Sequence, residues 1–188
     1  MTSLSDVSAG GMDASSARHP AYPLEQVARS RSTRFQIGFA RMTMHLLPRF
    51  ENVLLEASEK GLRIYAASEL ALALPGEVMR RIHADDVDIS EPQARLSYGT
   101  VVQEPIMWMR AAVPRTYCEP VVHHLIARGA AIDEVDWRAH SPVVRAKAPL
   151  RRLLGYPQSL EVLTGGAAQL EMGLSHYAPV PPEPGAAA

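Results

Sequence analysis

Apolar and polar positions alternate with two different periods along the second half of this chain. A period of two predicts strands at residues 106–113, 131–137, 143–148 and 169–177. A period near 3.6 predicts helices between them, at residues 116–128 and 150–164. Glycines follow both helices, where helices commonly end, and Pro157 is expected to interrupt the second one. Thr116 and Glu119 have the spacing of a capping box at the start of the first.

The first half shows a weaker pattern of the same kind. Apolar residues at helical spacing predict a helix at residues 49–60, between short strands at 42–47 and 62–67. Ser68 can cap a second helix, which Pro75 and Gly76 disturb before it resumes at residues 77–83, and a further short strand is expected at 87–90. These segments predict a β-α-β-α-β order for residues 41–91.

The element order sets the expected fold class. Strand, helix, two strands, helix and strand in the second half are typical of a ferredoxin-like, or split βαβ, sandwich. We therefore expect an α+β chain made of two small sandwiches of this kind in tandem, the second with the order βαββαβ.

Turn-forming residues and local composition predict four regions along the chain. Residues 1–32, rich in Ser, Ala and Gly, are expected to form a disordered tail. The first module then covers residues 33–100, the second covers 101–181, and residues 182–188 form a disordered end. Arg29, Arg31 and Arg34 lie in or beside the first tail, where they indicate either a phosphate-contacting arm or a solvated leader.

Charge and composition narrow the function class. The formal net charge is −1, which argues against a protein that mainly coats nucleic acid. The chain has no apolar run long enough for a membrane span, no secretory leader pattern and a single cysteine, Cys118. We expect a cytoplasmic protein, with neither a membrane nor DNA as a partner.

Candidate chemistry is sparse. There is no P-loop pattern, and Gly165-Gly166 is explained by a helix end. His123 and His124 are adjacent on a helix and point about 100° apart, so they cannot easily chelate one metal ion. Cys118 near these histidines could form a nucleophile and base, but a buried thiol is the competing interpretation. We predict no enzyme activity, no cofactor and no metal site.

A set of motifs in the second half occurs at a spacing known from one protein family. The sequence Glu104-Pro105-Ile106-Met107 opens the set, and its other members are Pro114, Tyr117, Pro149-Leu150, Gly155-Tyr156, Leu160, Leu163-Thr164, Gly166, Met172, His176-Tyr177 and Val180-Pro181. This pattern resembles domain V, the C-terminal domain of bacterial elongation factor G. The resemblance implies the βαββαβ order that the periodicity predicts independently.

The preceding stretch resembles domain III of the same family more weakly. Glu69-Leu70-Ala71-Leu72 stands where the family begins a helix, and Pro92-Gln93 with Tyr98 is similar to the segment that closes domain III, at a different spacing. In the family, a GTPase domain, a barrel and domain IV accompany these domains, and none of them fits into 188 residues. The resemblance thus implies a protein that lacks the GTPase and does not hydrolyse GTP.

Several cationic positions of the family differ here. Two family arginines are Glu161 and Ala167, and a basic helix end has become Ala127-Arg128-Gly129-Ala130. Residues 101–188 contain eight Lys and Arg against eight Asp and Glu. Each lost phosphate contact weakens RNA binding, so the charge pattern argues against a strong ribosome contact.

The resemblance implies a non-enzymatic, translation-related protein. Its expected partner is the ribosome, near the large-subunit factor-binding region, or another translation factor. The remaining cations of the second half are the candidate partner-binding residues, with ordinary solvated surface as the alternative: Arg128, Arg138, Arg145, Lys147, Arg151 and Arg152.

In a second hypothesis, the chain keeps the ferredoxin-like fold but does not bind the ribosome. The chain would then be a protein–protein or small-molecule-sensing module, and its oligomeric state is open. Trp108, Tyr117 and Trp137 would supply an exposed apolar patch, unless they pack in the core. A continuous basic face would favour the ribosome, and a large apolar face would favour the sensing module.

Overall fold

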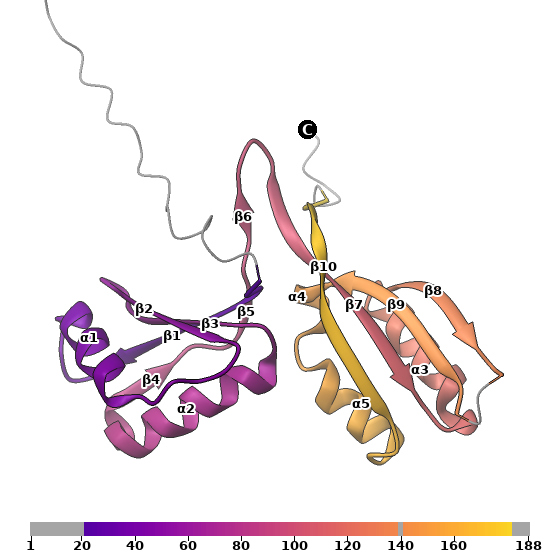
Figure 1. Ribbon diagram of the computed structural model, residues 1–188, viewed down its shortest axis with the longest axis horizontal. Coiled ribbons are helices and arrows are strands. Elements are labelled where there is room, and N and C mark those ends of the chain that lie inside the picture. The colour runs from indigo at the N-terminus through magenta and orange to yellow at the C-terminus, as the bar shows by residue number, and fades with distance from the viewer. Residues whose placement is uncertain (1–20, 139–140, 182–188) are drawn as a thin grey trace, which may run out of the picture.

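The computed structural model describes residues 21–138 and 141–181, which form two α+β modules side by side (Figure 1). Each module has an antiparallel sheet with its two main helices on one face, as a split βαβ sandwich requires. The fold class is therefore confirmed for both modules. None of the helices in this part of the chain combines the length and apolarity that crossing a bilayer needs.

The first module has the order β1 (Leu24–Ser30), α1 (Gln36–Leu46), β2 (Val53–Ser58), β3 (Gly61–Ala66), α2 (Glu69–His83) and β4 (Val87–Ile89), with a 3-10 turn, η1 (Ala84–Asp86), before β4. Its strands lie in the order β2-β3-β1-β4, and all of these neighbours are antiparallel. Short strands β5 (Gln93–Ala94) and β6 (Ser97–Tyr98) lead into the second module.

Strand β1 corrects the expected tail at residues 1–32. Residues 24–30 form a central strand of the first sheet, paired with β3 on one side and β4 on the other. Leu24 and Ala28 are buried against the helices, and they supply the apolar face that a central strand needs. Glu25 and Arg29, at the alternate positions, lie on the open face of the sheet. Residues 1–20 and 182–188 lie outside the described part of the chain.

The expected helix at residues 49–60 is also wrong, and so is the β-α-β-α-β order. Asn52 turns the chain with a positive φ of 57°, and β2 then pairs with β3 through a tight hairpin. The strand expected at residues 42–47 belongs largely to α1. The strand at 62–67 and the cap at Ser68, whose hydroxyl accepts a hydrogen bond from Ala71 N–H, are confirmed. Helix α2 continues through Pro75 without a break.

The second module has the order β7 (Val102–Ala112), α3 (Arg115–Ala127), β8 (Ala131–Asp136), β9 (Val143–Pro149), α4 (Leu150–Leu153), α5 (Tyr156–Thr164) and β10 (Gln169–Pro179). Its strand order is β10-β7-β9-β8. Every expected element is present here. Two local details differ: Pro114 occupies the N-cap of α3, so no Thr116 capping box forms, and the break falls at Leu154 and Gly155 rather than at Pro157, which lies in the first turn of α5.

The two modules meet where α2 begins and α4 ends. The Gly155 N–H donates to both carboxylate oxygens of Glu69, at 3.1 Å each. Burial raises the pKa of this carboxyl group, against the lowering effects of the Gly155 hydrogen bond and Arg128. Apolar side chains from both modules line a cleft of about 430 Å³ beside this contact, among them Leu24, Met107 and Leu150.

Candidate anion-binding cleft and predicted partner cations

Two of the six predicted partner cations are tied into the structure of the second module. The guanidinium of Arg128 donates to the carbonyl oxygens of Arg152 and Leu154, at 3.1 Å each, and to Ser159 Oγ at 2.9 Å. It also lies 5.4 Å from the centre of the Tyr156 ring. These contacts join the end of α3 to the link between α4 and α5.

Arg151 has a comparable structural contact. Its Nε donates to Glu104 Oε2 at 2.6 Å, and the side chain of Glu104 is only 1% exposed. A buried carboxylate needs a charged partner, so this arginine stabilises the start of β7.

Arg145 and Lys147 lie on the open face of the second sheet, where acidic residues balance them. Arg145 pairs with Glu134 at 2.6 Å, and Lys147 pairs with Asp133 at 3.1 Å. A third pair, Arg110 with Glu171, crosses the same face at 3.3 Å. Each of these three cations is paired with an acid, so they do not form the continuous basic face that would favour the ribosome.

Arg138 and Arg152 are the most available of the six. Both are exposed, and neither guanidinium has a carboxylate partner among the described residues. Arg138 follows β8, whereas Arg152 packs over Gly129, where any side chain would collide with it. The structure therefore does not gather the six cations into one cluster.

The tryptophans are more exposed than core packing would allow. Trp108 is 39% exposed and Trp137 is 48% exposed, whereas Tyr117 packs against the core. The Trp108 indole lies over Gly173 on β10, and the Arg115 guanidinium is 5.8 Å from the centre of the Trp137 ring. The two indoles belong to different elements, at β7 and after β8.

The cysteine and histidine alternative receives no support from geometry. Cys118 is fully buried, and burial raises the pKa of its thiol. His123 is exposed, while burial lowers the pKa of the half-buried His124, and no hydrogen bond in the described residues joins either ring to Cys118. A neutral, inaccessible thiol is a poor nucleophile.

A cationic cleft lies on the open face of the first sheet. Its volume is about 420 Å³, and its walls come from β1, β3, the β2–β3 turn and the β5–β6 segment. Its charged lining consists of four cations, Arg29, Lys60, Arg63 and Arg95, and one carboxylate, Glu25. The excess of positive charge makes this cleft the strongest candidate for binding an anion.

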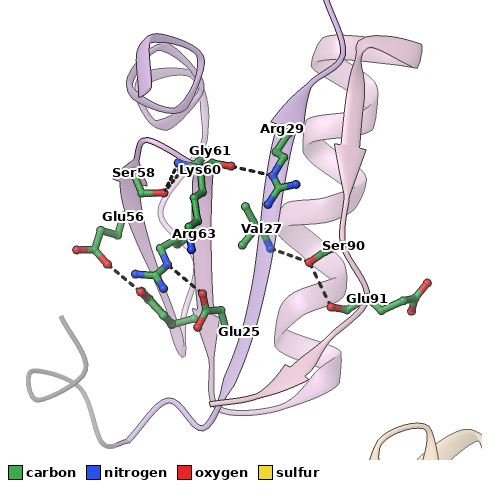
Figure 2. A network of polar contacts seen from close by, with 11 residues as sticks. Glu25, Val27, Arg29, Glu56, Ser58, Lys60, Gly61, Arg63, Ser90 and Glu91 are labelled. Carbon is green, nitrogen blue, oxygen red and sulfur yellow. Dashed lines mark hydrogen bonds and ion pairs between the residues drawn. The ribbon is translucent and has the colours of Figure 1, made fainter. Parts of the chain in front are cut away.

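Local structure explains how the cations reach this face. Alternation along β1 and β3 places Glu25, Val27 and Arg29 beside Arg63 and Tyr65, opposite the helices. Gly61 has a φ of +122°, and a side chain there would collide with the Ala28 carbonyl oxygen. At this turn the Lys60 carbonyl oxygen accepts a hydrogen bond from Arg29 Nε at 2.9 Å (Figure 2).

The other end of the cleft is built around Tyr65. Its hydroxyl donates to Glu56 Oε2 at 2.9 Å, and the Arg95 guanidinium lies 4.6 Å from the centre of its ring. Arg63 Nε donates to Glu25 Oε1 at 2.9 Å, as Figure 2 shows. Tyr98, at the rim, is 68% exposed.

Part of this site could be predicted from the sequence. The period-two pattern at residues 62–67 already placed Arg63 and Tyr65 on one face of a strand. The phosphate-contacting alternative named Arg29 but placed it on a tail, whereas the structure places it in β1. No local signal places Arg95 or Tyr98 at this cleft, because the chain brings them to the sheet only through the β5 pairing with β1.

Comparison with known proteins places the second module. The family profile described as "Elongation factor G C-terminus" matches residues 101–187. Elongation factor G from Fervidobacterium nodosum is 40% identical over 81 residues, which is 43% of this chain and 12% of that protein. The chain thus spans only a small part of the relative that it matches. Residues 101–187 are similar in sequence to the C-terminus of elongation factor G, their described part has the ferredoxin-like fold that the strand order shows, and the chain is translation-factor-like over this half.

Proposed function

We propose that this chain is a non-enzymatic, translation-related protein that associates with the ribosome through its second module. The observation that supports this most is the match of residues 101–187 to the elongation factor G C-terminus, over a module that keeps all six main elements of the fold. The expected region of contact is the factor-binding region of the large subunit. The first module, which the sequence predicts at residues 33–100 and which begins with β1 in the structure, corresponds in this proposal to domain III.

The charges of the second module favour a weak, salt-sensitive contact. Arg138 and Arg152 are the best-placed residues to contact phosphates, because no intramolecular carboxylate competes for them in the described part of the chain. Arg145 and Lys147 can contribute after their surface pairs open, which costs little. Arg128 and Arg151 mainly stabilise the fold, and their contribution to the ribosome contact is secondary.

Co-sedimentation with ribosomes tests this proposal. The full chain should pellet with ribosomes at low salt and be released at moderate salt. Replacing both Arg138 and Arg152 by Gln should reduce the bound fraction. A matched pair in the first module, Arg34→Gln with Arg41→Gln, removes the same charge from exposed positions and should change binding less. No association of the unaltered chain at low salt would rule the proposal out.

A protein-binding module is the second candidate. The observation in its favour is the charge-balanced open face of the second sheet, with Trp108 39% exposed at its centre. Exposed aromatic residues on such a surface are typical of protein contacts. In this case Trp108→Ala would abolish capture of a protein partner and leave ribosome co-sedimentation unchanged.

A further inference from the structure

We propose that the cationic cleft of the first module binds the phosphate backbone of single-stranded RNA. Four cations and one carboxylate line it, so the lining carries an excess of three positive charges. The choice of RNA rests on the proposed translational role, whereas the phosphate chemistry rests on the cleft alone.

Arg29 and Lys60 form the end of the cleft that is open to a ligand. The one carboxylate of the lining, Glu25, is engaged by Arg63 at 2.9 Å. No carboxylate of the described residues pairs with Arg29 or Lys60, and the two residues are held together by the bond from Arg29 Nε to the Lys60 carbonyl oxygen. This bond leaves the terminal nitrogens of Arg29 for a phosphate, which a guanidinium binds with two parallel hydrogen bonds.

The length of the cleft favours a polyanion over a single phosphate. Glu25 and Arg29 are four residues apart on β1, a span of about 13 Å along the strand. Arg95 reaches the sheet near the first of these positions, because β5 pairs with β1 at Glu25, but its side chain is only 7% exposed and packs on the Tyr65 ring. The exposed ring of this segment is Tyr98, and one phosphate held by Arg29 and Lys60 cannot span the cleft to it, whereas successive nucleotides of one strand can.

Tyr98 supplies a surface for a base. The Tyr65 ring is only 1% exposed and lies under Arg95, so it is not available for stacking. Tyr98, at the rim of the same cleft, is 68% exposed and can stack on an unpaired base. Cations that contact the backbone together with an exposed aromatic ring are typical of sites for single-stranded nucleic acid.

Fluorescence anisotropy of the full chain with a labelled, unstructured RNA of about 12 nucleotides tests this inference. Lys60→Gln and Arg29→Gln should each weaken binding about fivefold near 0.1 M salt, and each should reduce the salt slope by about 0.7. Tyr98→Ala should also weaken binding. Arg41→Gln is the matched control, because it removes one exposed charge from α1, on the covered side of the sheet, and should leave the affinity unchanged. A thermal melt of each variant confirms that it is folded.

The competitors distinguish the possible ligands. Single-stranded DNA of the same sequence that competes equally or less well agrees with a backbone contact. DNA binding without RNA binding would overturn the inference, as would equal competition by inorganic pyrophosphate or by an acidic peptide. Equal affinities for the Lys60 and Arg41 variants would also overturn it. Ribosome association without binding of free RNA would refute this inference alone, and the reverse result would refute the proposed function alone.

Discussion

Replacing Arg128 by Met should destabilise the second module, because this arginine joins α3 to the link between α4 and α5. The substitution removes three hydrogen bonds from the guanidinium and its contact with the Tyr156 ring. A typical net value of about 1 kcal/mol for each of the three hydrogen bonds, with about 0.5–1 kcal/mol for the cation–π contact, gives a total near 4 kcal/mol. Water can replace part of the bonding at this half-exposed site, so we expect a loss of about 2–3 kcal/mol.

Urea unfolding followed by tryptophan fluorescence measures this loss of unfolding free energy in the second module. Both tryptophans of the chain, Trp108 and Trp137, lie in the second module. The midpoint should fall while the slope with urea stays the same, since the surface exposed on unfolding is unchanged. Arg128→Lys keeps the positive charge but loses the planar set of guanidinium donors. It should therefore lower the free energy of unfolding by about half as much. A loss below about 0.5 kcal/mol, together with weaker ribosome binding, would refute the structural role and restore Arg128 as a partner contact.

Three further substitutions test separate features. Arg151→Met should cost about 2–3 kcal/mol in the same assay, because it leaves the buried Glu104 carboxylate without this partner, whereas the neighbouring Arg152→Met should cost less than about 0.5 kcal/mol. Recovery of part of the loss by adding Glu104→Gln would identify the unpaired charge as the cause. Glu69→Gln should stabilise the contact between the modules at neutral pH. Burial raises the pKa of Glu69 in the folded state. The contribution of this carboxyl group to the free energy of unfolding is therefore fully present below its ordinary pKa of 4.5 and is lost as the pH rises through its folded-state pKa. The gain from the amide should therefore vanish in acid, and a gain that is independent of pH would contradict the assignment. Gly61→Ala should cost about 2 kcal/mol or more, measured by circular dichroism, because its φ is +122° and a methyl group would meet the Ala28 carbonyl oxygen. Gly165→Ala, at a φ of +60° with open space around it, should cost about 1 kcal/mol, and equal losses at the two positions would contradict the steric argument.

The second module could be predicted from its sequence because local and long-range signals agree there. Residues 143–148 alternate apolar and polar positions, and the structure places the apolar ones against the helices and Arg145 and Lys147 on the open face. The positive φ of Gly129 and of Gly165 ends α3 and α5 where expected. The break near Pro157 was misplaced, since proline is well tolerated in the first turn of a helix, and the Thr116 capping box is absent because α3 begins one residue earlier than expected.

The first module was harder to predict because its elements depend on their partners. Residues 50, 53, 54 and 57 have helical spacing, but an isolated helix of this length is only marginally stable, whereas β2 pairs along its whole length with β3. Strand β1 is identified by its pairing with β3 and β4, which no local pattern contains. The cationic cleft was missed for the same reason, because it exists only once β1, β3 and β5 lie side by side.

Co-sedimentation of the unaltered chain with ribosomes, across a range of salt concentrations, tests the central claim most directly. We predict association at low salt that is lost at moderate salt, as a contact through a few exposed cations requires. A chain that stays in the supernatant at every salt concentration, including the lowest, would contradict the proposed role.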